Sequence, residues 1–299
     1  MVKYFLGIDG GGTKTTAAVS DENGNILLKK VGKTINFYSV GMEKARENLL
    51  SVIDEIYKEL GQVTFESVFV GCSALDREAD EQTLENLCGG INAKNIRMDS
   101  DLFVALKSVE NAVCPCVAIC GTGSMAIGEA ENGEIKFKGG WGHILGDEGS
   151  GYVISLNALK CCANFSDTGE ESILLEKAKE YFNVSDFRQA IDIIYSPETT
   201  KDVIAGFVLK VREAALEGDF IAESIIVNEA HNFARTVLCL LNEIEKSSVL
   251  ALYGGIFQHD RLFRDSFIED INEIYPELTI QLLDVPPEEG ALKIARGLI

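Results

Sequence analysis

The sequence predicts an α/β fold built from two copies of one structural unit. Two segments, residues 5–30 and 117–140, share a plan: an apolar strand, a Gly-rich turn, and two further strands joined by an Asn-Gly turn. Asn-Gly between alternating apolar runs is a strong hairpin signal, because both turn residues take positive φ. Alternating helical and extended patterns follow each copy. Such a chain forms a mixed sheet with helices on both faces.

Helices and strands alternate after the first copy of the repeat. Apolar residues at helical spacing predict a helix over residues 41–60, and a second helix is expected near residues 79–88. A buried strand, SVFVGC, ends near Cys72, and the short strand NIRMDS stops at Asp99. A further helix starts at Asp101.

The second half repeats this order with additional helices. Helices are expected across residues 149–245, and the part at about 165–245 is a helical insert. The run VLALYGGI predicts a buried strand that ends in two glycines, and a helix follows near residues 260–274. LTIQLLD predicts the next strand. Pro287 then falls in the first turn of a last helix, where proline is favoured.

The length of 299 residues fits two domains. We expect an N-terminal domain over residues 1–112 and a C-terminal domain over residues 113–299. The last helix, at about 288–299, is a candidate to pack on the N-terminal domain. Ligands bind at the loops after the strand ends in such folds, so we expect a central cleft between the two domains to hold them.

Composition narrows the classes of function. Hydrophobic residues make up 46% of the chain, which is enough for a substantial core. No apolar run approaches the roughly 20 residues of a membrane helix, and the start, MVKYFLGIDGGG, lacks a signal-peptide pattern. The net charge of −20 disfavours nucleic acids and anionic membranes, because phosphate contacts need Lys or Arg. We therefore expect a cytoplasmic protein without such partners.

The eight cysteines are expected to be reduced thiols. None forms a CxxC pair, and several lie in apolar runs such as CPCVAIC. Free cysteine packs as a small hydrophobic residue in cytosolic proteins. A metal site through Cys114, Cys116 and Cys120 is the alternative, although their spacing is not a usual ligand spacing and no His follows closely.

The first Gly-rich turn, DGGGTKT, has the composition of a phosphate-binding loop. Gly11 and Gly12 lack side chains that would keep a ligand away from the backbone. Asp9 brings a carboxylate to the same place, which suits a phosphate only with Mg²⁺ between them. Thr13 and Lys14 add a hydroxyl group and a positive charge. The spacing is not that of a Walker loop, and a plain hairpin is the alternative.

A second Gly-rich turn, GTGS at residues 121–124, occupies the equivalent place in the repeat. Two such turns facing each other can hold the β- and γ-phosphates of a nucleotide. We assign Gly123 and Ser124 to the substrate side of this turn. A third glycine pair, Gly254 and Gly255, follows an apolar strand and allows close approach of adenine or ribose. Plain tight turns and strand-to-helix packing are the alternatives.

These features together resemble the actin-like ATPase (ASKHA) superfamily, whose ribonuclease H-like fold occurs in actin, hexokinase and acetate kinase. More closely, the chain resembles the N-acetylglucosamine kinase branch of the BadF/BadG/BcrA/BcrD ATPase family. The resemblance covers nearly the whole chain, and its most specific piece is GGWGHILGDEGSGYVI, residues 139–154. It implies a duplicated actin-like ATPase fold, with ATP and Mg²⁺ as cofactors and a sugar as substrate.

The resemblance also implies roles for single residues. Asp9 would hold Mg²⁺ through water, with Thr13 and Thr122 near the ATP phosphates. Asn36 matches a sugar-contacting Asn, and Asp101 matches the catalytic base at the start of a helix, where it would also bind substrate. The alternatives are a simple loop residue for Asn36 and a helix N-cap for Asp101.

In the second half, Trp141, Gly142 and Asp147 match the sugar-binding part of the long motif. Ala215 and Gly255 match positions around the adenosine. The alternative for Trp141 is a core position, and the alternative for Asp147 is a helix cap.

Two positions depart from the family pattern. The family often has Thr-Asp-Ala or Asn-Asp-Ala around the base, whereas this chain has Ser100-Asp101-Leu102. Asp99 lies two residues before Asp101, so a role shared between the two aspartates stays open. Met125 follows the GTGS turn where the kinases often carry Asn, which leaves the shape of the acyl-group pocket open.

The sequence thus predicts an ATP-dependent N-acetylhexosamine kinase that forms a 6-phosphate, with N-acetylglucosamine favoured over N-acetylmuramic acid or glucosamine. One alternative is an ATP-driven activator of a 2-hydroxyacyl-CoA dehydratase, which bridges an iron–sulfur cluster between subunits. The sugar motif around Trp141 opposes it. The other alternative is a non-catalytic sugar or nucleotide sensor. Homodimers are common in the family, and no apolar stripe in the sequence proves one.

Overall fold

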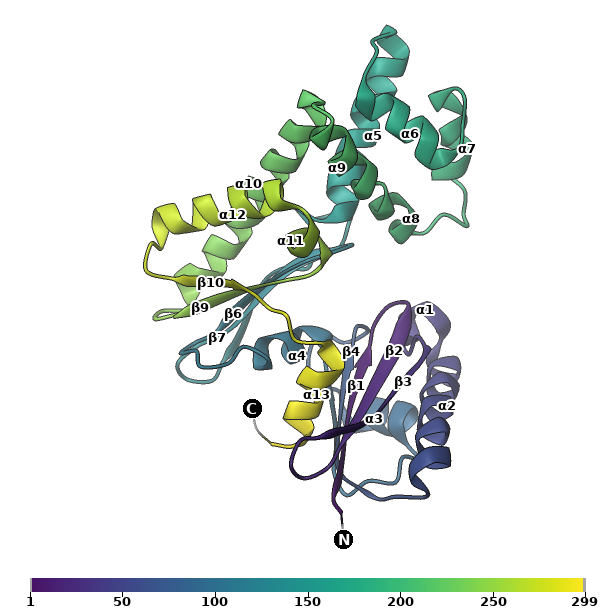
Figure 1. The fold of residues 1–299 in the computed structure, drawn as a ribbon, viewed down its shortest axis with the longest axis vertical. Coiled ribbons are helices and arrows are strands. Elements are labelled where there is room, and N and C mark those ends of the chain that lie inside the picture. Colours follow the sequence, from purple (N-terminus) through teal and green to yellow (C-terminus); the bar gives the residue numbers. More distant parts are fainter. Residues whose placement is uncertain (1, 298–299) are drawn as a thin grey trace. The chain divides into compact units, whose positions relative to one another are not determined.

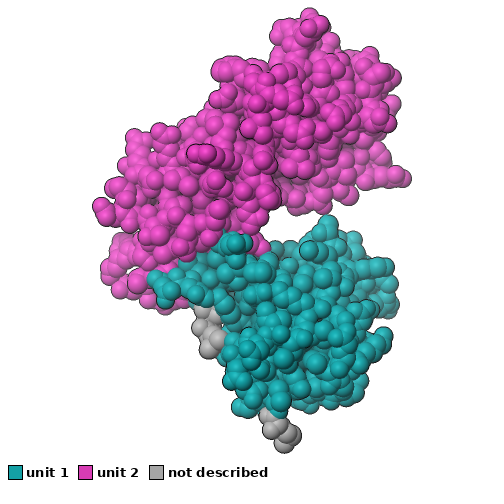
Figure 2. All heavy atoms as spheres, viewed as in Figure 1, with its two compact units in different colours: residues 1–111, 283–299 teal, residues 112–282 magenta. Residues whose placement is uncertain are grey.

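The computed structural model describes residues 2–297. The chain divides into two compact units, coloured separately in Figure 2. Unit 1 contains residues 1–111 and 283–299, and unit 2 contains residues 112–282. The C-terminal segment, which we assign to the second domain from the sequence while naming its last helix as a candidate to pack on the first, clusters with the first unit.

Unit 1 is built on a mixed five-stranded sheet. Its strands are β1 (Tyr4–Gly10), β2 (Lys14–Ser20), β3 (Ile26–Lys33), β4 (Phe65–Cys72) and β5 (Ile96–Asp99). β1, β2 and β3 form an antiparallel meander, and β4 and β5 continue the sheet in parallel beside β1 (Figure 1). Its helices are α1 (Phe37–Val40), α2 (Met42–Leu60), α3 (Glu81–Cys88), α4 (Asp101–Lys107) and α13 (Pro287–Ala295).

The two faces of this sheet bury different side chains. Successive residues of a strand point to opposite faces, so Val68 and Val70 of β4 join the core formed with α2, while Phe69 packs with α4 and α13. This near-continuous apolar run is what a strand covered on both faces requires. The helices therefore hold the sheet from both sides and fix the loops at its carboxyl edge.

Unit 2 repeats this sheet. Its strands are β6 (Cys116–Cys120), β7 (Ser124–Glu129), β8 (Ile135–Gly139), β9 (Val249–Tyr253) and β10 (Thr279–Leu282). β6, β7 and β8 form an antiparallel meander, and β9 and β10 add parallel strands beside β6. The strand order β8-β7-β6-β9-β10 matches the order β3-β2-β1-β4-β5 of unit 1, strand by strand. The predicted duplicated α/β fold is confirmed.

Helices fill the long interval between β8 and β9. They are α5 (Gly151–Thr168), α6 (Ile173–Phe182), the 3₁₀ helix η1 (Phe187–Gln189), α7 (Ala190–Ile194), α8 (Lys201–Gly206), α9 (Val208–Leu216) and α10 (Phe220–Glu243). α11 (Gly255–His259) and α12 (Arg261–Ile274) follow β9, and α12 runs beside α10 (Figure 1). The rings of Phe233, Phe257 and Phe267 pack together between α10, α11 and α12, with centroids 4.9 to 6.1 Å apart.

Most expected elements occur within a few residues of the expected bounds. The helix expected near residues 79–88 begins at Glu81, because the Asp80 side chain accepts the Thr83 N–H and acts as the N-cap. The short helix α1 has no periodic signal and is not predicted. Within residues 2–297, no helix combines the length and the apolar composition that a membrane span needs.

The cysteines of the described chain are free thiols, and Cys114, Cys116 and Cys120 are buried in the core of unit 2. No group of three or more His, Cys, Asp or Glu side chains within residues 2–297 is placed to hold a metal ion. The alternative of a metal site at these three cysteines therefore has no support in the described part of the chain.

α13 packs directly on β1, and Gly7 makes this approach possible. A Cβ built on Gly7 would lie 2.2 Å from the Leu292 backbone nitrogen. Lys29 on β3 adds ion pairs with Glu288 at 2.9 Å and with Glu289 at 2.7 Å. The close packing, more than these partly exposed ion pairs, holds the helix on the sheet.

Replacing Gly7 by alanine should destabilise unit 1 by about 1–3 kcal/mol, because the new methyl group overpacks the backbone of α13. Urea unfolding followed by circular dichroism would measure the change. Gly133→Asn is the control, since nothing lies within 4 Å of its Cβ position and Asn tolerates positive φ. Equal stability of the two variants would contradict the packing of α13 on β1.

Candidate active site

The carboxyl ends of the central strands of unit 1 bring two aspartates together. Asp9 pairs with Gly71 across β1 and β4. A Cβ built on Gly71 would lie only 3.7 Å from the Cα of Asp101, the first residue of α4. Asp9 and Asp101 are thus neighbours across one glycine, at the edge where parallel strands present ligand-binding loops.

Little positive charge balances this pair. Burial raises the pKa of Asp9 to about 7; the charges of Asp101 and Glu288 also raise it, and Lys14 lowers it. Burial raises the pKa of Asp101 as well. A divalent cation would favour the ionised form of both groups. Mg²⁺ is usually held by one or two carboxylates together with water and substrate phosphates, and these residues fit that mode of binding.

The Gly-rich turn between β1 and β2 leaves its backbone open. Nothing lies within 4 Å of the Cβ position of Gly12, and Thr13 and Lys14 are exposed. The Thr34 hydroxyl group donates to the Gly11 carbonyl oxygen at 2.7 Å and so fixes the base of the turn. An open glycine backbone of this kind can approach phosphate oxygens closely.

Asn36 lies at the same edge and is held through both atoms of its amide group. Its Oδ1 accepts the N–H groups of Tyr38 and Ser39, which makes it the N-cap of α1. Its Nδ2 donates to Ser73 Oγ at 3.1 Å, and Ser73 Oγ donates to the Gly10 carbonyl oxygen at 3.0 Å. Asn36 is therefore fixed relative to the glycine turn and is not a simple loop residue.

Asp101 does not cap α4, because Ser100 is the N-cap. The Asp99 carboxylate accepts the Ser100 N–H at 2.6 Å. After burial, the charge of Asp101 is the largest cause of the raised pKa of Asp9, and Asp99 is not among the causes. Of the two nearby aspartates, Asp101 is the one that interacts with Asp9.

In unit 2, the second Gly-rich turn rests on the N-terminus of α5. The Gly151 N–H donates to the Gly121 carbonyl oxygen at 2.8 Å. Ser124 Oγ donates at 2.7 Å to the Glu148 carbonyl oxygen. Gly123 faces Asp147 itself, since a Cβ there would lie 2.9 Å from Asp147 Oδ2. The turn and the segment before α5 thus form one packed element.

Asp147 is buried in a left-handed conformation, with φ of 62°. Burial raises the pKa of its carboxyl group, and the Ser124 backbone N–H lowers it. Ser150, not Asp147, caps α5, so the capping alternative for Asp147 is wrong. Trp141 is 74% exposed and Gly142 takes positive φ, so this end of the motif is a surface loop and not core.

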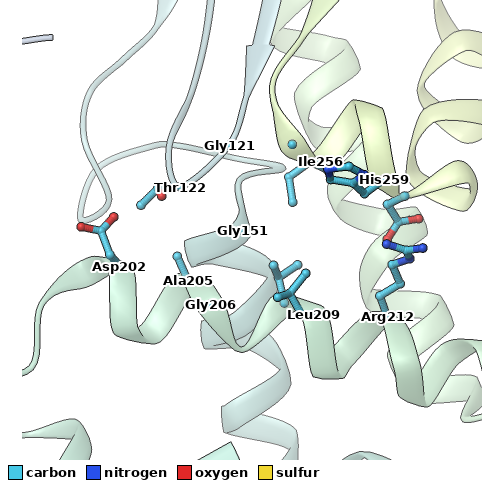
Figure 3. Close-up of a pocket in the computed structure, with 13 residues that line it drawn as sticks. Gly121, Thr122, Gly151, Asp202, Ala205, Gly206, Leu209, Arg212, Ile256 and His259 are labelled. Atoms are coloured by element: carbon cyan, nitrogen blue, oxygen red, sulfur yellow. The ribbon is translucent and has the colours of Figure 1, made fainter. Parts of the chain in front are cut away.

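A pocket of about 270 Å³ lies beside the second Gly-rich turn. Leu209 and its neighbours on α8, α9 and α11 supply mainly apolar walls. Thr122 and Asp202 lie at one end, and Arg212 and His259 at the other (Figure 3). Apolar walls with a few polar groups are typical of small-molecule sites. The remaining lining residues are Gly121, Gly151, Ala205, Gly206, Val208, Gly255, Ile256 and Asp260.

The two glycines after β9 differ in their roles. Gly254 has φ of 107°, and a Cβ there would lie 2.3 Å from the Cys120 carbonyl oxygen, so Gly254 allows β9 to pack on β6. A Cβ on Gly255 would meet only His259, at 3.9 Å, and Gly255 lines the pocket. Ala215 packs against the core of unit 2 and does not line this pocket.

Sequence reasoning missed several residues that the fold brings to these sites. Thr34 and Ser73 directly follow β3 and β4, so attention to every polar residue at a strand end would find them. Asp202, Arg212 and His259 come from three separate helices. No local pattern distinguishes them from ordinary surface residues.

Two sheets of matching topology, each with a Gly-rich turn after its first strand, define the duplicated fold of the actin-like ATPases. A Chromobacterium violaceum structure, provisionally described as an N-acetylglucosamine kinase, shares this fold with a TM-score of 0.80 and 21% identity, covering 98% of this chain and 99% of that chain. The chain belongs to the BadF/BadG/BcrA/BcrD ATPase family, whose model matches residues 6–295.

Two relatives match over nearly their full length. The N-acetylmuramic acid/N-acetylglucosamine kinase of Clostridium acetobutylicum is 30% identical, with 99% of each chain covered. The N-acetyl-D-glucosamine kinase of Dictyostelium discoideum is 29% identical, with 98% of each chain covered. The predicted family is confirmed, and the use of ATP follows from membership in it.

Replacing Asp9 by asparagine should stabilise the metal-free protein more at pH 8 than at pH 5. Asp9 has a folded-state pKa of about 7, above its ordinary value of 3.8. Between these values the unfolded chain binds fewer protons, so stability falls as pH rises. From pH 5 to pH 8 this loss is about 2–3 kcal/mol, and asparagine removes it.

Urea unfolding in EDTA at the two pH values would measure this difference. Asp54→Asn, at an exposed position on α2, is the control and should keep the wild-type pH dependence. If Asp9→Asn and the wild type lose stability equally between pH 5 and pH 8, the raised pKa of Asp9 is wrong.

Proposed function

We propose that this chain is an ATP-dependent amino-sugar kinase that phosphorylates the 6-hydroxyl group of N-acetylglucosamine, with N-acetylmuramic acid or glucosamine as further substrates. The partly buried Asp9–Asp101 pair supports this most strongly, because desolvation raises both pKa values at a ligand-binding edge. A relative named as a kinase of two of these sugars matches 99% of the chain. As part of the same proposal, the kinase acts in the cytoplasm.

The proposal assigns adenosine to the pocket of unit 2. Its apolar walls would contact the base, and Arg212 and His259 offer polar contacts at one end. At the other end, Gly121 and Thr122 would meet phosphate, since the backbone of a glycine turn can approach phosphate oxygens closely. Gly12 and Lys14 of the first turn are also assigned to ATP binding.

Mg²⁺ held through water by Asp9 would neutralise part of the charge on the transferred phosphoryl group. Catalysis by the protein itself then depends mainly on alignment. Asn36 is suited to this task, because its amide is fixed by Ser73 and by the backbone of α1. Trp141, with its exposed ring, and Asp147 are assigned to sugar binding as well.

Asp101 is assigned as the catalytic base. The sugar hydroxyl oxygen attacks the γ-phosphorus, and the bond from the γ-phosphorus to the bridging oxygen of ADP breaks. The hydroxyl proton passes to the Asp101 carboxylate. A carboxylate with a raised pKa accepts this proton more readily, provided that it is ionised when the sugar binds.

Asp101→Asn should lower kcat about 100- to 10,000-fold, because asparagine keeps the shape of the side chain but cannot accept the proton. The Kd for ATP should change by less than about threefold. A coupled assay of ADP release with N-acetylglucosamine measures the first quantity, and calorimetry measures the second. Asp99→Asn is the matched control, since Asp99 is buried but does not raise the pKa of Asp9.

Wild-type turnover by Asp101→Asn would reject Asp101 as the base. Absence of sugar-dependent ADP release by the wild type, across N-acetylglucosamine, N-acetylmuramic acid and glucosamine, would reject the proposed function itself. It would favour the sensor or the dehydratase activator.

The two glycines after β9 allow a second test, of the nucleotide site. Gly255→Val should weaken ATP binding at least about tenfold by filling the pocket, with little loss of stability, because its Cβ position has free space. Gly254→Ala should instead destabilise unit 2 by about 1–3 kcal/mol, because its Cβ collides with Cys120. Normal ATP affinity in folded Gly255→Val would place the nucleotide elsewhere.

A further inference from the structure

We propose that Glu229 of α10 is a positioning residue that holds Asp147 in place against the second Gly-rich turn. The inference rests on the proposed function, in which Asp147 binds the sugar and the turn binds phosphate. Glu229 itself does not line the pocket and is only 6% exposed. It would therefore act through the backbone that it holds and not through contact with a substrate.

The Glu229 carboxylate accepts three hydrogen bonds from neutral N–H groups. Oε2 accepts the backbone N–H of Gly149 at 2.9 Å. Oε1 accepts Asn157 Nδ2 at 3.1 Å and Asn232 Nδ2 at 3.2 Å. Hydrogen bonds to an ionised acceptor are stronger than those between neutral groups, and burial excludes competing water. The two asparagines fix the carboxylate, and the carboxylate fixes Gly149.

Gly149 is held closely on its other sides as well. Its carbonyl oxygen accepts the Cys120 thiol at 3.1 Å, so both of its backbone polar groups are bonded. A Cβ built on Gly149 would lie 2.6 Å from the Cβ of Phe233, one turn after Glu229 on α10. The backbone therefore has little freedom while the bond to Glu229 is made.

The position of Gly149 determines that of Asp147, two residues earlier. Asp147 takes a left-handed φ of 62°, a strained conformation for a residue with a side chain. Such strain persists only where the surroundings impose it. Three hydrogen bonds hold this segment: the Ser150 N–H donates to the Asp147 carbonyl oxygen, Ser124 Oγ donates to the Glu148 carbonyl oxygen, and the Gly149 N–H donates to Glu229.

The same segment supports the phosphate side. The N–H groups of Gly151 and Tyr152 donate to the carbonyl oxygens of Gly121 and Thr122, at 2.8 and 3.3 Å. Releasing Gly149 should thus disturb the alignment of the sugar relative to the turn. Most of the pocket walls come from α8, α9 and α11, so nucleotide affinity should change little.

Two variants separate the effect of the length of the Glu229 side chain from the effect of its charge. Glu229→Gln keeps an oxygen that can accept the Gly149 N–H, and its amide can donate to the asparagine side chains once these turn over. Glu229→Asp keeps the charge but is one methylene too short to reach Gly149. We expect kcat/KM for the sugar to fall about 10- to 100-fold in Glu229→Asp and to stay within about threefold of wild type in Glu229→Gln. The Kd for ATP should stay within about threefold in both variants.

Asp219→Asn is the matched control for damage to a buried carboxylate. Asp219 is buried in the same unit and accepts the N–H groups of Leu174, Ile221 and Ala222, away from the sugar segment. This variant should lose stability but keep the wild-type KM for the sugar. Hydrogen–deuterium exchange across residues 141–155 should be faster in Glu229→Asp and unchanged in Asp219→Asn.

The two measurements fail in different ways. If wild-type protein phosphorylates no sugar, the proposed function fails, but the exchange experiment still decides whether Glu229 positions the segment. Exchange and sugar kinetics in Glu229→Asp that match those of Asp219→Asn would overturn the positioning role. Loss of sugar kinetics in Glu229→Gln equal to that in Glu229→Asp would overturn it too, because a side chain that still reaches the Gly149 N–H would then fail to hold the segment.

Discussion

The burial of carboxyl groups near little positive charge is the constraint on which both units depend. The chain has 47 acidic and 27 basic side chains, which gives a net charge of −20. In unit 1, two carboxyl groups at the carboxyl edge of the sheet lack enough positive charge nearby. Burial raises the pKa of Asp9 to about 7 and also raises that of Asp101. The fold tolerates this cost because close packing across Gly71 holds the two groups in place.

In unit 2, by contrast, hydrogen bonds stabilise the ionised carboxylate of Asp219. Burial alone would raise its pKa, but the N–H groups of Ala222, Leu174 and Ile221 together lower it. A carboxylate with this many donors stays ionised and supports the helices around it. Asp219 is therefore a structural acid, whereas Asp9 and Asp101 are candidates to bind ligands. A cation or a proton would stabilise the folded protein at Asp9 and Asp101, where few donors already bond the carboxyl group.

Local sequence patterns predict the parts of the fold that are local in origin. The strand–turn–strand repeat, the Gly-rich turns and the helix over residues 41–60 all follow from spacing within short segments. The pocket does not, because Asp202, Arg212 and His259 meet only after α8, α9 and α11 have packed. Caps are equally hard to predict. Ser100 and Asp101 are both favoured N-cap residues, and only the observed backbone selects Ser100.

The two halves of the duplicated fold differ at one equivalent position. Asp9 precedes the Gly-rich turn of unit 1, and Cys120 precedes that of unit 2. Asp9 pairs with Gly71 of β4, and the Cys120 carbonyl oxygen lies against Gly254, which directly follows β9. Where unit 1 has a carboxyl group, unit 2 has a neutral thiol that donates to the Gly149 carbonyl oxygen. A second acid there would face the buried Asp147 and Glu229, so the thiol lets this copy of the turn support backbone without adding charge.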